Sequence, residues 1–394
     1  MTISADPAAH WWAYVIIALG CAVIGYAANL VSRTLMLKPV RFVGAGPIGW
    51  HGSVPRNAAK LATDLARRVV PELLSGQEIF SRLDPDELTE QIRGPLLRAA
   101  EDLTVELMEQ HKPGLWEFLP ERGKQMLIAD VRDAAPGLAR RLVEQIQIDV
   151  ADVFDLEHLI RAVLAEDPAL LARLTGNIAY RAFRFMTASG ALIGLAVGVL
   201  AALLLAFTGQ LVLLPIFGLI TGLLARVIGT RALFTSYALR RMRRPMAVEF
   251  AAAMAGEIVT VDNIVSELLR GPRSPRLHAL VRRDVQHLTD SQLSLAKPLI
   301  SITIGARSLQ EIKQAAADAL LHRFSTTVKQ AEKYAASAMA VRATVLHRTL
   351  RMAPESLYQL LRPTMAADSW RLTLLASVSG LIIGGIAFII WAAT

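Results

Sequence analysis

The chain has 394 residues, of which 53% are hydrophobic and only 19% are charged, and its formal net charge is +8. Residues 1–32, 187–225 and 372–394 contain no lysine or arginine. This composition excludes an ordinary soluble enzyme and is typical of a polytopic membrane protein. The single cysteine, Cys21, lies in the first of these stretches, so an intramolecular disulfide is excluded.

The apolar stretches predict membrane-spanning helices. As one straight helix, residues 187–225 would run roughly 58 Å at about 1.5 Å per residue, nearly twice the roughly 30 Å hydrocarbon core of a bilayer. The stretch must therefore fold back, and the polar residues Thr208–Gln210 mark the turn. We expect four transmembrane helices, over residues 11–31, 188–207, 211–228 and 372–391.

The distribution of positive charge predicts the topology. All 42 Lys and Arg residues lie within residues 33–186 and 226–371, several of them directly beside the spans. By the positive-inside rule, both intervening segments are cytoplasmic, and the two termini and the hairpin tip lie outside. The amino terminus lacks the basic region of a cleavable signal peptide, so we expect the first span to be a retained anchor.

The first intervening segment, 38–186, is expected to be helical. It opens with Pro39–Trp50, which is rich in Gly and Pro and is predicted to be a loop at the membrane surface with an aromatic anchor. Apolar residues then recur at helical spacing from Leu61. Ser75 followed by Glu78 forms a capping box, which predicts the start of a further helix.

The second intervening segment, 231–370, is also predicted to be helical. Thr260 is a helix cap before an apolar stripe. Residues 306–353 contain neither Gly nor Pro, and apolar or small residues recur there in steps of three and four. This pattern predicts one long, coiled-coil-like helix that packs against a partner helix. The predicted fold class is an all-α membrane protein with two helical cytoplasmic segments.

The chain also contains a weak internal repeat, over units 11–207 and 211–391. The matching positions are Gly25 with Gly222, Ser75 with Thr260, and Gly190 with Gly380, at offsets of 197, 185 and 190. Each unit reads as a span, a helical segment and a span. Because the chain crosses the membrane twice in each unit, the two units have the same orientation, which predicts a parallel repeat.

Three stretches carry a resemblance to a known family. They are Gly25 to Pro39 with Asn29 between them, Gly46–Pro55, and Leu268–Ser274. They resemble the signature stretches of the bacterial membrane-protein family catalogued as domain of unknown function 445, of the YheB/YjiN type, and the likeness spans nearly the whole chain. It implies a helical protein of the bacterial cytoplasmic membrane, and the family brings no established activity.

The sequence departs from the family pattern at Leu30 and Leu37, where the family usually has aromatic residues. In the second unit Arg226 stands where Asn29 stands in the first, so a role for this asparagine is not shared by both halves.

Small residues spaced four apart within the spans predict close helix packing. Lipid gives no hydrophobic drive for helix association, so small faces that let backbones approach are the usual device. Packing within the bundle or in a homo-oligomer is favoured over the lining of a conduit. The candidate packing residues are Gly190, Gly194, Gly198, Gly218, Gly222, Gly380 and Gly384.

Two basic stretches are the strongest electrostatic features. Positive-inside retention is the simplest interpretation, and contact with anionic lipid headgroups is the functional one. Nucleic acid is not expected as a partner, because no nucleic-acid motif accompanies the charge. The candidate headgroup residues are Arg240, Arg241, Arg243, Arg244, Arg270, Arg273 and Arg276.

Catalysis has little support in the sequence. None of the eight histidines has a histidine partner at the spacing of a helical metal site, and Glu157–His158 reads as a surface or interface pair. We therefore expect no enzyme activity, cofactor or metal. The leading hypothesis is a structural or interaction scaffold with a basic collar that contacts anionic lipids. The alternatives are a lipid or amphiphile carrier and, third, an enzyme with a dispersed site.

Overall fold

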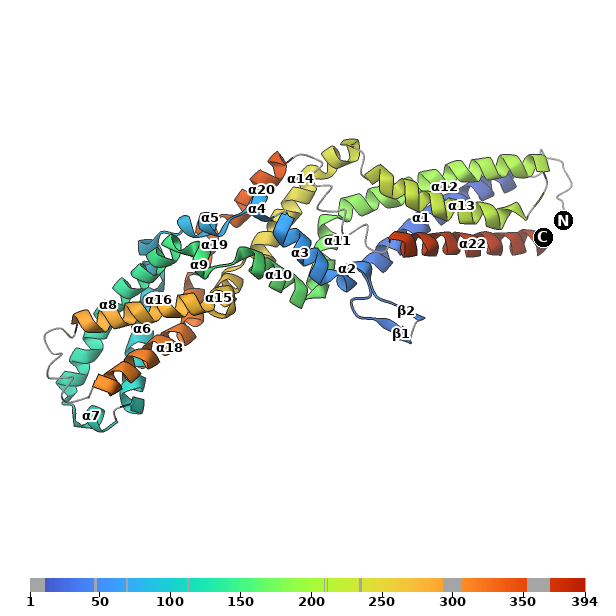
Figure 1. Ribbon diagram of the computed structural model, residues 1–394. Coiled ribbons are helices and arrows are strands. Elements are labelled where there is room, and N and C mark those ends of the chain that lie inside the picture. The colour runs from blue at the N-terminus through green and yellow to red at the C-terminus, as the bar shows by residue number, and fades with distance from the viewer. Residues whose placement is uncertain are drawn as a thin grey trace. The chain divides into compact units, whose positions relative to one another are not determined.

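The structure is a computed structural model, and it describes residues 11–45, 48–68, 70–111, 113–208, 210, 212–233, 236–292, 306–352 and 369–393. Nearly all of these residues are helical, which confirms the predicted all-α fold (Figure 1). The chain divides into two compact units. We call Met1–Leu65, Leu164–Ala251 and Leu346–Thr394 the membrane unit, and Ala66–Val163 with Ala252–Val345 the helical unit.

Four long helices form the core of the membrane unit. They are α1 (Trp11–Leu37), α12 (Tyr180–Thr208), α13 (Leu213–Leu233) and α22 (Ser369–Ala393). Helix α1 packs on the other three, α12 packs on α13, and α13 packs on α22. The start of α1, the end of α22 and the α12–α13 turn lie at the same end of this bundle (Figure 1).

These helices identify the chain as a multi-pass membrane protein. Over the described residues, the segments long and apolar enough to cross a membrane are Tyr14–Leu37, Tyr180–Thr208, Leu213–Arg231 and Trp370–Ile389. Large apolar side chains face outward on them, including Val23 at 66% exposure and Leu192 at 68%. Such an outer surface is unfavourable in water and is favoured by lipid.

The central turn lies where the sequence predicts it, because α12 ends at Thr208 and α13 begins at Leu213. The helices run beyond the predicted spans. Helix α12 begins at Tyr180, well before residue 188, because a charged stretch with good helix-forming residues extends an apolar helix without interruption.

The loop predicted at Pro39–Trp50 contains a short hairpin instead. Strands β1 (Val43–Ala45) and β2 (Ile48–Trp50) pair antiparallel, with Val43 opposite Trp50. The indole nitrogen of Trp50 donates to the carbonyl of Leu35, 2.8 Å away, and so ties the hairpin to the end of α1. The other helices wholly or mostly in this unit are α2 (Ser53–Arg56), α3 (Ala58–Arg68), α11 (Pro168–Ile178), α14 (Ser236–Ala253) and α20 (Val341–Arg351).

The helical unit is built around two helix pairs, one from each half of the chain. Helices α6 (Pro85–His111) and α8 (Glu121–Ile148) pack on each other, as do α16 (Ser274–Gln292) and α18 (Ala306–Val328). The pairs also pack together, because α6 contacts α18 and α8 contacts α16. The shorter elements are α4 (Val70–Leu73), α5 (Gly76–Ser81), α7 (Pro113–Phe118), α9 (Val150–Val153), α10 (Leu156–Glu166), a π-helix over Met254–Ile258, α15 (Val261–Arg270), a 3-10 turn over Lys329–Ala331 and α19 (Glu332–Met339).

Both predicted helical segments contribute to both units. The segments 38–186 and 231–370 do not each form a separate body, because one part of each joins the membrane unit and the rest meet in the helical unit. The reason is that the apolar faces of helices from both halves are buried against one another, which a reading of each segment by itself does not reveal.

The predicted single helix over 306–353 is wrong for its described part. Helix α18 ends at Val328, and Ala340, between α19 and α20, has a φ of 47° in the left-handed region. This conformation cannot continue a right-handed helix. The break lets α19 turn onto α5, α6 and α15.

Both predicted helix caps are confirmed. The hydroxyl of Ser75 accepts from the backbone amide of Glu78, and the hydroxyl of Thr260 accepts from the amide of Asn263, each at 3.2 Å. The Glu78 carboxylate pairs with Arg82 at 2.7 Å.

Candidate functional site

The helical unit encloses an apolar cavity of about 150 Å³. Its walls come from both halves of the chain: α5, α6 and α8 on one side, and α15, α16, α18 and α19 on the other. All of its lining residues are Ala, Val, Leu, Ile, Met or Phe except Arg323 and Thr327. We call this space the apolar cavity.

The cavity follows from the apolar stripes of the surrounding helices. Leu96 and Leu103 of α6 and Leu142 of α8 line it at helical spacing, and Leu320 and Phe324 of α18 do the same from the second half. Protein interiors normally contain few voids larger than a water molecule. An apolar cavity of this size stays dry and takes up hydrocarbon, because water inside it would find no polar partners.

A second, polar hollow adjoins the apolar cavity between α6 and α18. It has a volume of about 210 Å³, and its lining includes Arg98, Asp102, Thr326 and Gln330. We call it the polar recess. The two spaces share Ala99, Arg323 and Thr327 as lining residues, so they adjoin each other.

Arg323 is held at the boundary between the two spaces. Its guanidinium pairs with Glu106 at 2.7 Å and with Asp102 at 3.5 Å, and its side chain remains one-third exposed. The long aliphatic stem of an arginine can line an apolar wall while its head stays polar. Arg323 therefore presents a cation to the polar recess and carbon atoms to the apolar cavity.

An ion pair near the start of α6 connects this helix to α8. Arg140 pairs with Asp86 at 3.0 Å and with Glu144 at 2.9 Å. The hydrogen bond to Glu144, followed by the charge of Asp86, raises the pKa of Arg140. Both pairs are largely exposed, so they contribute little to stability, and only the pair with Asp86 joins the two helices.

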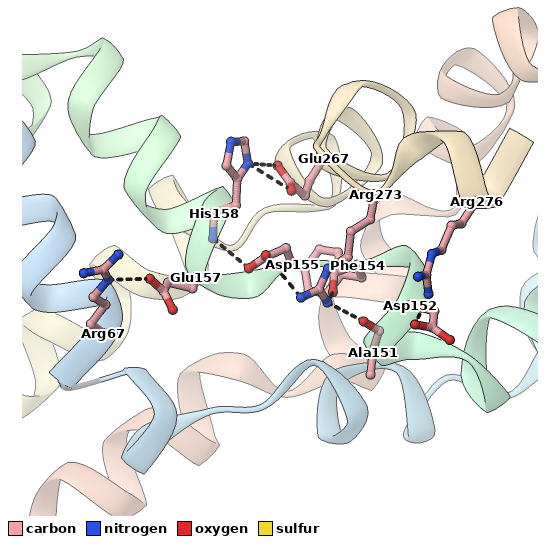
Figure 2. A network of polar contacts seen from close by, with 10 residues as sticks. All are labelled: Arg67, Ala151, Asp152, Phe154, Asp155, Glu157, His158, Glu267, Arg273 and Arg276. Atoms are coloured by element: carbon pink, nitrogen blue, oxygen red, sulfur yellow. Dashed lines mark hydrogen bonds and ion pairs between the residues drawn. The ribbon is translucent and has the colours of Figure 1, made fainter.

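A polar network joins the α9–α10 corner to α15 and α16 (Figure 2). The carboxylate of Asp155 accepts from the His158 amide at 2.9 Å and lies 3.4 Å from Arg273. Arg273 also donates to the carbonyls of Ala151 and Phe154. These contacts satisfy the backbone of a tight corner, and so they give the network a structural role.

Glu267 is a buried carboxylate in this network, and its side chain is 6% exposed. His158 Nδ1 lies 2.8 Å from its Oε2 atom and 3.0 Å from its Oε1 atom. Glu157 and His158, predicted to be surface or interface residues, make different contacts. His158 contacts the buried Glu267, whereas Glu157 pairs with Arg67 at the surface (Figure 2). In the described part of the chain, no group of three or more His, Cys, Asp or Glu side chains is arranged to hold a metal ion.

The two basic stretches lie in different units. Arg240, Arg241, Arg243 and Arg244 belong to α14 of the membrane unit, and the stretch from Arg270 to Arg276 belongs to the helical unit. Half-buried Arg243 donates to the carbonyl of Met352 at 2.8 Å, and Arg244 is exposed. The side chains of Arg240 and Arg241 lie outside the described set.

In the second stretch, Arg270 is exposed, whereas Arg273 and Arg276 are held by the α9–α10 corner, with Arg276 paired to Asp152 (Figure 2). Arg273 and Arg276, two of the predicted headgroup residues, therefore make their bonds within the helical unit.

The candidate packing glycines lie at close helix crossings. A side chain at Gly25 would collide with the Gly190 carbonyl, and one at Gly218 would collide with the Gly380 carbonyl. Gly194 meets the backbone at Cys21. For the remaining candidates, a Cβ atom added at Gly198 would approach Ala18, one at Gly222 would approach Ala376, and one at Gly384 would approach Leu214 and Pro215.

The α1–α12 and α13–α22 crossings have similar glycine contacts, but the glycines that match differ from those paired in the sequence. Gly25 on Gly190 matches Gly218 on Gly380, which gives offsets of 218 − 25 = 193 and 380 − 190 = 190. The sequence paired Gly25 with Gly222 instead, one helical turn further along. Small residues recur every four positions here, so the sequence by itself does not distinguish adjacent turns.

Comparison with known protein families, with curated proteins and with solved structures finds no match to this chain. The assignment of a function therefore depends on the geometry of the sites.

The sequence did not reveal the apolar cavity or the polar recess. Their lining residues read as ordinary amphipathic stripes, because the spacing of a stripe is the same whether it meets another helix or encloses a space.

Proposed function

We propose that this membrane protein binds an amphiphile in its helical unit, with the hydrocarbon tail in the apolar cavity and the polar head in the polar recess. The observation that supports this proposal is that the two spaces share Ala99, Arg323 and Thr327 as lining residues. Ligand sites are typically concave and mostly apolar, with a few polar groups that fix orientation. The carrier hypothesis accounts for this cavity, whereas a pure scaffold gives no reason for it.

The membrane anchor supports the same proposal. A protein that spans the bilayer several times works beside the largest store of amphiphiles in the cell. The head is expected to be polar, because Arg98, Asp102 and Arg323 line the polar recess and the charge of Arg323 is balanced there by Asp102 and Glu106.

The test is binding of radiolabelled palmitate to the delipidated, full-length protein. Ala139 lines the apolar cavity, and an Ala139→Phe substitution fills part of it. Gly137 lies on the same helix and faces open space, so Gly137→Phe is the matched control. We expect Ala139→Phe to weaken binding by about ten-fold, which corresponds to about 1.4 kcal/mol, and Gly137→Phe to leave it unchanged.

Two results would contradict the proposal. One is wild-type protein that neither retains lipid after purification nor binds palmitate. The other is equal binding by both phenylalanine variants, which would place the probe elsewhere, for example on the outer apolar surface of the membrane unit.

A scaffold remains a second candidate, and the exposed arginines Arg244 and Arg270 favour it. Each cation near an anionic bilayer surface contributes about 1 kcal/mol to binding. If the scaffold hypothesis is correct, the Arg244→Gln and Arg270→Gln variants lose a co-purifying protein partner or a homo-oligomer, measured by cross-linking in native membranes, while palmitate binding persists. Neither candidate includes catalysis, a cofactor or nucleic acid.

The proposed location is the bacterial cytoplasmic membrane, with both termini outside and residues 38–186 and 231–370 in the cytoplasm. Support comes from the arginines beside the spans and from the resemblance to the family of domain of unknown function 445. A carboxy-terminal reporter that is active only in the cytoplasm would contradict this topology.

We also propose that the chain is a duplication. The helix caps at the equivalent positions Ser75 and Thr260 support it. The helix contacts in the helical unit also support it, because α6 packs on α18 and α16 packs on α8. An offset of 185 places α6 on α16 and α8 on α18, so each contact maps onto the other.

A further inference from the structure

A buried polar cluster lies within the bundle of the membrane unit, near the end where α1 and α13 finish. Asn29 is 0% exposed and Arg226 is 4% exposed. The Asn29 side-chain amide donates to the carbonyls of Met186, at 2.9 Å, and Ala225, at 3.2 Å. It thereby ties together α1, α12 and α13, and it lies beside the peptide that carries Arg226.

The guanidinium of Arg226 has no oxygen partner in the described part of the chain. Its Nη1 atom makes one weak contact, 3.6 Å from the sulfur of Met186, and its Nε atom is buried without a partner. Helices α1, α12, α13 and α22 contain no Asp or Glu. The bundle therefore holds a buried positive charge with no carboxylate on any of its four helices.

The same cluster holds an unpaired acceptor. Asn29 Oδ1 is buried without a hydrogen-bond donor, while its side-chain nitrogen donates to the two carbonyls. A buried unpaired charge costs several kcal/mol, and an intramembrane ionisable residue usually marks a functional site. Water would satisfy the hydrogen bonds of this cluster but not the charge. An anion satisfies the charge of Arg226, and a hydroxyl beside the anion can donate to Asn29 Oδ1.

We propose that Arg226 and Asn29 form an intramembrane site for a phosphate group that carries a neighbouring hydroxyl. A phosphate oxygen accepts from the Arg226 guanidinium, and the hydroxyl donates to Asn29 Oδ1. Met186, which now occupies one guanidinium N–H through its sulfur, has a flexible side chain and moves aside. A lipid headgroup such as phosphatidylglycerol has both groups, and its phosphate is concentrated at the membrane face where α1 and α13 end.

This site is independent of the amphiphile-binding cavity, because it lies in the membrane unit and shares no residue with the apolar cavity or the polar recess. A failure of either proposal leaves the other standing.

The experiment uses delipidated, full-length protein in detergent and measures the midpoint of thermal unfolding, together with bound lipid by native mass spectrometry. Three additions are compared: phosphatidylglycerol, phosphatidylcholine and inorganic phosphate. We expect phosphatidylglycerol to raise the midpoint most. A response to inorganic phosphate of the same size would keep the site but assign it to free phosphate.

The deciding variant is Arg226→Met, which removes the charge and keeps a long apolar side chain. Replacing an unpaired buried charge with an apolar group stabilises a protein, so we expect the lipid-free midpoint to rise. The same variant should lose about ten-fold or more in affinity for phosphatidylglycerol. A residue with a merely structural role would not give this combination. The matched control is Arg231→Gln, on the same helix and exposed, which should respond as the wild type does.

Arg226→Lys is the second variant. It keeps the charge but replaces the planar guanidinium with an ammonium group, and it should bind the phosphate more weakly than the wild type and more strongly than Arg226→Met. The proposal is overturned if no addition stabilises the wild type, or if Arg226→Met responds to phosphatidylglycerol as the wild type does.

Discussion

His158 Nδ1 lies 2.8 Å from the buried carboxylate of Glu267, which joins α10 to α15 across 109 residues of sequence. Removing the imidazole leaves this carboxylate without its partner. We expect His158→Ala to lower the free energy of unfolding by about 1–3 kcal/mol, measured by chemical denaturation of the helical unit in the full-length protein.

The matched control for this prediction is the neighbouring surface pair of Arg67 and Glu157, which lie 3.0 Å apart. Exposed pairs contribute little, so Glu157→Ala should change stability by less than about 1 kcal/mol. Equal effects of the two substitutions would show that burial of Glu267 does not matter.

The glycine crossings predict a position-dependent response to a single methyl group. A Cβ at Gly25 or Gly218 would collide with a backbone carbonyl of the facing helix, whereas Gly20 and Gly385 have nothing within 4 Å. Gly25→Ala and Gly218→Ala should each destabilise the bundle by about 1–3 kcal/mol, seen as a lower thermal midpoint in detergent. Gly20→Ala and Gly385→Ala should be neutral or slightly stabilising, because alanine favours the helix.

The two helix caps should have similar energetic value. Ser75→Ala and Thr260→Ala each remove the acceptor of one backbone N–H, so each should cost about 1 kcal/mol of stability. Thr63→Ala is the control, because this hydroxyl bonds back to Ala59 within its own helix and caps no helix end. A loss at Thr63 as large as at the caps would contradict the capping argument.

The left-handed residue between α19 and α20 predicts a stabilising substitution. Ala340 has a φ of 47°, a conformation that costs an alanine roughly 1–2 kcal/mol and glycine almost nothing. Ala340→Gly should raise the thermal midpoint. Ala336→Gly, at an exposed position within α19, should lower it by the usual helix penalty of about 1 kcal/mol.

Much of the fold follows from local features of the sequence. The turn after Thr208 follows from length, since an uncharged stretch twice as long as a bilayer is thick has to reverse. The caps at Ser75 and Thr260 follow from side chains that bond to amides three residues away. The break at Ala340 escaped prediction, because alanine is the best helix former and only contacts made by α19 elsewhere in the chain force it out of the helix.

The membrane spans follow from the sequence, whereas the candidate sites follow from the tertiary structure. The sequence by itself determined that this is an all-α membrane protein with four spans, because the requirement to bury apolar surface and satisfy backbone groups in lipid acts on each segment separately. Only the tertiary structure decided that the two halves share one helical unit, that Ala99 and Arg323 border a cavity, and that Arg226 is buried without a counter-ion. These features depend on which helix faces meet across distances of more than a hundred residues, and the spacing along a single helix does not encode its partner.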